Sequence, residues 1–203
     1  MSIRLIAGLG NPGRKHERDR HNVGFWFVSR LAVLQEVEMR SQPRFHGVVG
    51  KAGLAGSEVW FVMPQTYMNA SGMAVGALAR FYKIAPEQCL VVHDELDFAP
   101  GVAKLKRGGG VAGHNGLKDI AAHLGTQDYW RLRIGIGHPG DKNVVADYVL
   151  SSPSTPEREL IESAVARCLE ASPLLLAGHM HAAMLKLHTR ERPEQAGEDA
   201  QGS

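Results

Sequence analysis

Apolar and polar residues follow two different periods along this chain, which predicts a protein built from both strands and helices. Residues 3–7 alternate as a strand does before a glycine-rich stretch. Phe27, Leu31 and Leu34 instead recur at helical spacing. The same criteria predict strands in residues 3–7, 45–54, 58–64, 89–96, 101–106 and 131–139, and helices in 23–35, 69–84, 117–124, 154–172 and 178–187.

Three of these segments carry local signals that strengthen the assignment. The strands 45–54 and 58–64 are separated by an Ala-Gly-Ser turn, which predicts a hairpin. Ser154 stands three residues before Glu157 with Pro156 between them, as at the capped start of a helix. The apolar face expected on that helix consists of Leu160, Ile161, Ala164, Val165 and Leu169.

The order of elements predicts the fold class. Strands and helices alternate, with one hairpin and with neither repeats nor a linker, and 203 residues suffice for one well-buried domain. We therefore expect a single three-layer α/β domain over residues 1–189, with a mixed twisted β-sheet flanked by helices. Residues 190–203 are almost devoid of apolar side chains and are expected to form a disordered polar tail.

Composition narrows the class of protein. No apolar run approaches the ~20 residues of a membrane span and the start does not resemble a signal peptide, so a cytoplasmic protein is expected. Cys89 and Cys168 are expected to be reduced, buried thiols. The net charge is +2, but without residues 190–203 there are 21 basic against 17 acidic residues, which permits an anionic partner.

The stretch "GLGNPG" at residues 8–13 matches the G-x-G-x-x-G pattern of dinucleotide-binding proteins. That pattern functions where a strand passes straight into a helix whose N-terminus holds the phosphates. Here Pro12 and a charged stretch follow, and the first predicted helix begins only near Asn22 or Val23. An NAD or FAD enzyme is therefore the weaker interpretation.

Several polar residues fall at predicted strand ends and loop–helix junctions, where α/β proteins bind ligands. They are Asn11, His21, Asn22, Asn69, His93, Asp94 and Asn115. A histidine beside a buried carboxylate suits acid–base chemistry, and the asparagine amides suit an amide or ester ligand. The asparagines could equally be helix caps or turn formers. Neither H-E-x-x-H nor G-x-S-x-G occurs, so neither a metal nor a serine nucleophile is expected.

Six stretches together identify a family. The segments "GLGNPG", "RHNVGF", "PQTYMNASG", "HDELD", "GGGVAGHNGLKDI" and "RLRIGIGHPG" resemble the bacterial peptidyl-tRNA hydrolases, in the same order and over residues 5 to about 150. The resemblance implies a monomeric α/β enzyme without cofactor. It would hydrolyse the ester between a peptide and tRNA, contacting the acceptor stem and the CCA end.

The resemblance also implies roles for individual residues. His21 corresponds to the general base that activates water, and Asp94 to the residue that orients its imidazole. Asn11 corresponds to the residue that recognises the peptide and disfavours unblocked aminoacyl-tRNA. Further contacts with the peptide and the terminal nucleotide are implied for Tyr67, Asn69 and Asn115. Of these, Asn69 and Asn115 are the candidates for stabilising the oxyanion.

The chain departs from the family pattern at two places. His16 stands where tyrosine is usual, and it is expected to replace that ring in part against the substrate. Val111 and Ala112 stand where His-Gly is common. Both departures concern substrate affinity more than the type of reaction.

Cations for the tRNA backbone are expected on two predicted strands. Lys104 and Lys106 alternate and so share one face, as do Arg131 and Arg133. Ordinary solvated charges are an equal alternative for each of them alone. A protein that only binds RNA, as some organellar splicing factors similar to this family do, is the rival function.

Overall fold

The structure, a computed structural model, describes residues 2–54 and 56–188 and contains one seven-stranded mixed sheet. The strand order is β2-β3-β4-β1-β5-β7-β6, in which β4, β1, β5 and β7 run parallel and the others antiparallel to their neighbours. The strands are β1 (Leu5–Gly8), β2 (Arg40–Gln42), β3 (Gly47–Leu54), β4 (Ser57–Pro64), β5 (Cys89–Glu95), β6 (Ala103–Arg107) and β7 (Trp130–Gly135). The predicted tail, 190–203, lies outside the described residues.

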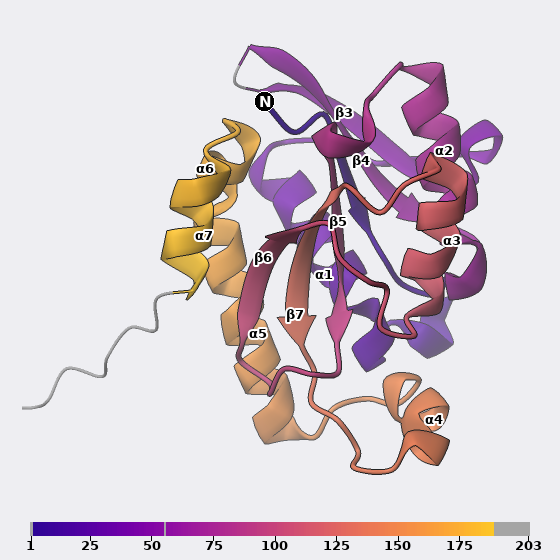
Figure 1. Ribbon diagram of the computed structural model, residues 1–203, viewed down its shortest axis with the longest axis vertical. Coiled ribbons are helices and arrows are strands. Elements are labelled where there is room, and N and C mark those ends of the chain that lie inside the picture. The colour runs from indigo at the N-terminus through magenta and orange to yellow at the C-terminus, as the bar shows by residue number, and fades with distance from the viewer. Residues whose placement is uncertain (1, 55, 189–203) are drawn as a thin grey trace, which may run out of the picture.

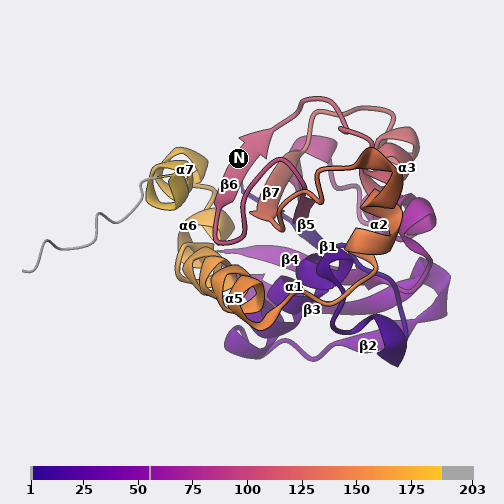
Figure 2. The same cartoon turned by 90° about the horizontal axis from the view of Figure 1, so that it is seen from below.

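Helices cover both faces of the sheet, as Figures 1 and 2 show. In both views α5, α6 and α7 lie on one side of the sheet and α2 and α3 on the other. The helices are α1 (Val23–Leu34), α2 (Ser71–Phe81), α3 (Asn115–Leu124), α4 (Val145–Val149), α5 (Thr155–Glu170), α6 (Ser172–Leu176) and α7 (Met180–His188). The predicted α/β class with a mixed sheet between helices is confirmed.

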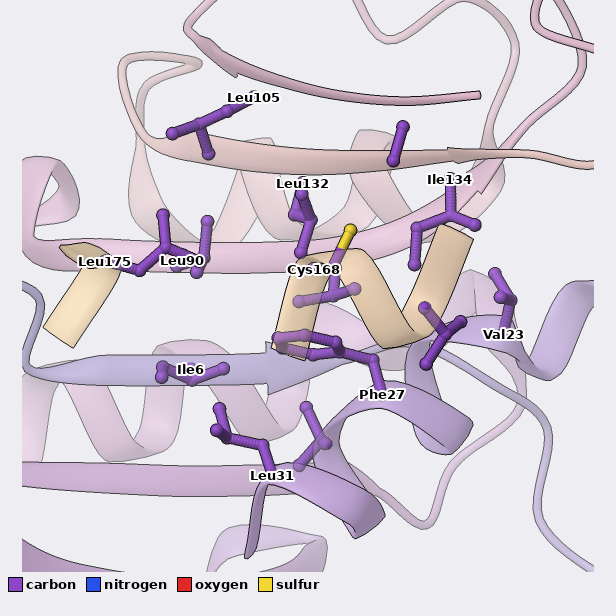
Figure 3. Packing of buried hydrophobic residues seen from close by; sticks show 14 of the residues in the cluster. Ile6, Val23, Phe27, Leu31, Leu90, Leu105, Leu132, Ile134, Cys168 and Leu175 are labelled. Carbon is purple, nitrogen blue, oxygen red and sulfur yellow. The ribbon is translucent and has the colours of Figure 1, made fainter. Parts of the chain in front are cut away.

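Two hydrophobic cores fill the space between the three layers. Alternation along β1 supplies both: Ile6 faces the core beneath α1 and α5, whereas Leu5 and Ala7 face the core beneath α2 and α3. Figure 3 shows the first core, where Phe27 and Cys168 pack close to the sheet. Both cysteines are free and buried, as predicted.

The elements were predicted more accurately than the exposure of single side chains. The hairpin of β3 and β4 is confirmed, as is the capping box of Ser154 and Glu157 that starts α5. Leu34 and Leu160 were wrongly assigned to apolar faces, because they are 60% and 51% exposed. Val28 on α1 and Cys168 on α5 are buried instead, and the sequence reading also missed the short elements β2, α4 and α6.

The glycine-rich stretch does not lead from β1 into an α-helix. Two 3₁₀ turns, Arg14–His16 and Arg20–Asn22, separate β1 from α1, which begins at Val23. The chain therefore does not pass directly from the glycines into the helix, as it does in a dinucleotide site. None of the helices in residues 2–54 and 56–188 combines the length and the hydrophobicity of a membrane span.

Candidate active site

The turn that carries His21 is clamped from two directions. On one side, Asn22 accepts a hydrogen bond from Asn11 N and donates one to Asn11 O, both 2.9 Å long. On the other side, Arg20 donates to the Ser151 hydroxyl at 2.8 Å and to the Glu157 carboxylate at 2.8 Å. These bonds tie the turn to the carboxyl end of β1 and to the start of α5, so His21 has a fixed position.

Within that frame, His21 faces the buried carboxylate of Asp94 near the end of β5. His21 Nδ1 lies 2.9 Å from both carboxylate oxygens. Burial lowers the pKa of His21, but the charge and hydrogen bond of Asp94, together with the charge of Asp19, outweigh it and raise that pKa above 6.5. The imidazole is thus a stronger base than an ordinary histidine.

A second histidine binds the same carboxylate. His114 Nε2 lies 3.0 Å from Asp94 Oδ1, and His114 Nδ1 accepts hydrogen bonds from the backbone N–H groups of Gly116 and Leu117 at the start of α3. Because Nδ1 accepts, the ring proton sits on Nε2 and points at Asp94. Burial opposes the charge on Asp94, yet His21 and His114 hold the pKa of this carboxyl well below its usual range.

The pattern of protons leaves one nitrogen free for chemistry. Asp94 accepts the Nδ1 proton of His21, so His21 Nε2 carries a lone pair in the neutral ring. A carboxylate that fixes the tautomer of a histidine in this way leaves the opposite nitrogen ready to take a proton from water or a hydroxyl.

His21, Asp94 and His114 also offer three potential metal-ligand atoms within 4.8 Å of one another. A divalent ion at this position would need the lone pair of the His114 nitrogen that faces Asp94. That nitrogen carries its proton, because the backbone N–H groups of α3 occupy the other one. The donor set therefore fits a hydrogen-bonded array better than a metal centre.

The sequence patterns do not single out His114. They indicate the neighbouring Asn115 as a polar residue at a loop–helix junction, and His114, the actual N-cap of α3, stands one position earlier. Histidine is an uncommon cap, so local patterns gave no reason to prefer it.

A cleft opens beside the three residues, and we call it the His21 cleft. Its volume is about 480 Å³, within the range of small-molecule sites. Its walls are the loop of residues 110–114, the sheet face of β5 and β7, and α4 with the turn before it. The cleft is lined by His21, His93, Asp94, Glu95, Leu96, Lys106, Gly110, Val111, Ala112, Gly113, His114, Asn115, Leu117, Arg131, Arg133, Lys142, Val145, Ala146 and Val149.

Comparison with known proteins identifies the family to which this site belongs. The family model for peptidyl-tRNA hydrolase matches residues 5–195. The chain belongs to the peptidyl-tRNA hydrolase family. A peptidyl-tRNA hydrolase of Nitrosospira multiformis is 56% identical over 190 residues, which cover 94% of this chain and 100% of the relative. One of Nitrosomonas europaea is 54% identical over 191 residues, covering 94% and 98%.

A solved structure of this family has the same fold. The crystal structure of the peptidyl-tRNA hydrolase from Acinetobacter baumannii matches with a TM-score of 0.89 and 46% sequence identity, covering 91% of this chain and 94% of that one. The resemblance found in the six sequence stretches is therefore confirmed.

The four predicted cations of this family member lie on one sheet face. The β6–β7 register pairs Lys104 with Arg133 and Lys106 with Arg131, and directly paired residues point to the same side. Their surroundings differ, however. Lys104 and Lys106 are exposed, Arg133 donates to Glu95 at 2.9 Å, and Arg131 is only 3% exposed.

Asn11 lies in a neighbouring cleft of about 500 Å³, which we call the Asn11 cleft, lined among others by Asn22, Phe25, Trp26 and Met63. The side-chain oxygen of Asn11 accepts the N–H of Met68 at 2.8 Å. This bond orients the amide, so its NH₂ group points away from Met68 N and has no hydrogen-bond partner among the described residues.

The other predicted substrate residues occupy separate positions. His16 lies on the 3₁₀ turn Arg14–His16, and its Nδ1 is 2.7 Å from Asp19 Oδ2. Tyr67 is 67% exposed and directly precedes the turn that carries Asn69. Asn69 and Asn115 are exposed, with no side-chain hydrogen bond to any described residue, and Asn115 lines the His21 cleft. Within the described residues, the side chains of Asn11, Asn69 and Asn115 do not cap the N-terminus of any helix.

Proposed function

We propose that this enzyme hydrolyses the ester joining a peptide to the 3′ ribose of tRNA, and that His21 is the general base. One observation carries the assignment of the base. The buried Asp94 fixes the Nδ1 proton of His21, which leaves Nε2 as a free lone pair at a cleft large enough for the reacting end of the substrate. A base placed in this way contributes ~10²–10⁴-fold to the rate.

The reaction then needs no covalent intermediate. His21 Nε2 takes a proton from water as the water oxygen attacks the ester carbon. The tetrahedral intermediate collapses with loss of the ribose oxygen, which receives the proton from the imidazolium. Because an ester carbonyl is already activated and the imidazolium protonates the departing ribose oxygen, neither a metal nor an enzyme nucleophile is required, and we propose that no cofactor takes part.

The negative oxygen of that intermediate needs hydrogen-bond donors. Asn115 lines the same cleft as His21, and its amide makes no hydrogen bond to any residue described, so its NH₂ is available. Asn69 is the second candidate. A donor aimed at the developing oxyanion supplies about 3 kcal/mol.

We assign the peptide end of the substrate to the region around Asn11. Its unpartnered NH₂ group suits a peptide carbonyl, and Phe25 and Trp26 give the Asn11 cleft an aromatic lining. The exposed ring of Tyr67 and the partly buried ring of His16 are proposed to contact the substrate nearby.

We assign the acceptor stem and the CCA end to the basic sheet face. Lys104, Lys106 and Arg133 are the proposed phosphate contacts. Arg131 receives a different role, because its two Nη groups donate to the carbonyls of Gly109 and Gly110 and hold the loop over the cleft. We further propose that the protein acts as a monomer in the cytoplasm.

The test measures ester release from two substrates. Purified protein should release the acyl group from N-acetyl-aminoacyl-tRNA and spare the same tRNA with an unblocked aminoacyl group. Asn11→Ala should weaken that preference, because it removes the proposed contact with the peptide carbonyl. A protein that binds tRNA but releases neither acyl group would favour the rival RNA-binding function and overturn the proposal.

A further inference from the structure

The loop between β5 and β6, residues 96–102, is held against the end of β7. Gly137 N, just beyond β7, donates to Phe98 O at 2.8 Å. Gly135 permits the close approach, because a Cβ added there would lie 2.3 Å from Ala99 O and 2.8 Å from Phe98 Cβ. These contacts fix the backbone from which the Phe98 side chain extends.

Glu95, the last residue of β5, is a buried carboxylate that accepts two hydrogen bonds. Its Oε2 accepts from Arg133 Nε at 2.9 Å, and its Oε1 accepts from Asp97 N at 3.2 Å. The bond to Nε leaves both Nη groups of Arg133 without a hydrogen-bond partner among the described residues. Those two groups can bind a phosphate through parallel hydrogen bonds.

The ring of Phe98 contacts two cations. The guanidinium carbon of Arg133 lies 4.4 Å from the ring centroid, and Lys104 Nζ lies 5.0 Å from the same centroid. Lys104 and Arg133 are also directly paired in the β6–β7 register, where like charges destabilise a sheet. Glu95 compensates Arg133, whereas Lys104 has no ion-pair partner among the described residues. The arrangement therefore retains positive charge, which suits an anionic ligand.

From this geometry we infer that Glu95 and Phe98 are positioning residues, which hold Arg133 and Lys104 in place for phosphates of the tRNA backbone. The inference rests on the proposed function. Side chains that are already ordered lose little rotamer freedom when the ligand binds, so preorganisation increases affinity. If Glu95 only weakened the positive field, its removal would have the opposite effect on affinity.

The test compares two variants of equal charge. Glu95→Ala should lower the affinity for deacylated tRNA by about 2- to 10-fold, the cost of ordering one long side chain on binding, although it removes a negative charge. Glu95→Gln removes the same charge but keeps an acceptor for Arg133, so it should recover part of the loss. Titration measures both affinities. Affinity equal to or above that of the wild type in Glu95→Ala would overturn the proposal, as would equal affinities of the two variants.

A double-mutant cycle shows whether Glu95 acts through Arg133. In an Arg133→Ala background, Glu95→Ala should not lower the affinity further, because the side chain that it positions is gone. The same fold loss in both backgrounds would contradict the inference.

Phe98→Leu tests the ring separately, because it keeps apolar bulk but removes the π face that contacts Arg133 and Lys104. It should also lower the affinity for deacylated tRNA, and an unchanged affinity would contradict the role of the ring. Together with Glu95→Gln it decides the question if Glu95→Ala does not fold.

Glu58→Ala is the matched control. It also removes a carboxylate paired with a cation, Lys51 at 2.8 Å, but on β4, which β1 and β5 separate from β7. Its affinity for deacylated tRNA should equal that of the wild type. In ester release, the loss in Glu95→Ala should appear in KM more than in kcat, and a loss confined to kcat would contradict a positioning role.

Failure of this inference and failure of the proposed function give different results. A wild type that binds tRNA and releases the acyl group, with undiminished affinity in Glu95→Ala, contradicts the positioning role alone. A wild type that does not hydrolyse N-acetyl-aminoacyl-tRNA contradicts the proposed function.

Discussion

Asp94 is a buried carboxylate shared by two imidazoles, and this sharing gives the site its character. The Nδ1–H of His21 and the Nε2–H of His114 both point at it. One carboxylate thus fixes the tautomers of both rings. His21 is left with a free nitrogen, whereas the second nitrogen of His114 is occupied by the backbone of α3.

Asp94→Asn should change the pH dependence of the reaction. Protonated His21 cannot accept a proton, so kcat/KM should fall as the pH drops through its pKa, which lies above 6.5 in the wild type. The substitution removes the charge that raises this pKa and leaves the burial that lowers it. The acid limb should therefore move to lower pH, with the plateau reduced by ~10²–10⁴-fold.

A pH–rate profile of both proteins measures this shift. Asp128→Asn is the matched control, because the exposed Asp128 carboxylate bonds to Arg107 and makes no hydrogen bond to His21. Its acid limb should stay within a few tenths of a pH unit of the wild type. An unmoved limb in Asp94→Asn would contradict the coupling of the two residues.

The site was predicted in part, and the missing part is informative. Residue types at strand ends, together with the resemblance, indicated His21 and Asp94, and the structure places them in contact. His114 was missed because its role depends on how the loop before α3 folds back over β5. No period or motif within that loop encodes such a return.

At the scale of elements, close contact between α1 and the sheet brings His21 to the end of β1. Gly24 in the first turn of α1 makes this approach possible. A Cβ added there would lie 2.4 Å from both Leu9 N and Val92 O, which are backbone atoms that cannot easily move aside. The sequence alone predicts the helix but not this contact, since Leu9 follows β1 and Val92 lies on β5, and both meet α1 only in the folded sheet.

Gly24→Ala should consequently lower the free energy of unfolding by about 1–3 kcal/mol through overpacking. It should also lower activity, because α1 carries the His21 turn at its start. Gly53→Ala is the matched control, since an added Cβ there meets nothing within 4 Å. Thermal denaturation and ester release measure both effects. Equal melting temperatures for the two variants would contradict this account of the packing.

The same limit explains the errors in the predicted helix faces. Leu34 and Leu160 fit a helical apolar pattern but point to solvent. Which of several apolar positions is buried depends on the angle at which the helix meets the sheet, and α1 and α5 also pack against each other. The period of apolar residues predicts whether a segment is a helix or a strand, but the element that packs against a helix determines which of its faces is buried.

At the scale of the whole molecule, positive charge is concentrated on the sheet face beside the His21 cleft. Lys104, Lys106 and Arg133 stand on neighbouring strands there. The molecule as a whole carries only +2, so composition alone could not locate this surface. The alternation of the strands predicted each pair, and the antiparallel register of β6 and β7 brings the two pairs together.

Affinity for tRNA should fall steeply with added salt, because phosphate contacts release counterions. Lys106→Ala should reduce the slope of log Kd against log salt by about 1. Arg40→Ala is the control, since Arg40 is an exposed cation on the distant edge strand β2 and should leave the slope unchanged. Titration at four salt concentrations measures both. If Lys106→Ala and the wild type had the same slope, Lys106 would not belong to the proposed interface.

The proposed role of His21 as the general base underlies the whole reaction. Its most direct test is the single-turnover rate of ester release from N-acetyl-aminoacyl-tRNA by wild type and by His21→Ala, with tRNA affinity measured in parallel. If His21 is the base, the substitution should reduce the rate by ~10²–10⁴-fold and leave tRNA affinity nearly unchanged. A variant that retains the wild-type rate would contradict this role.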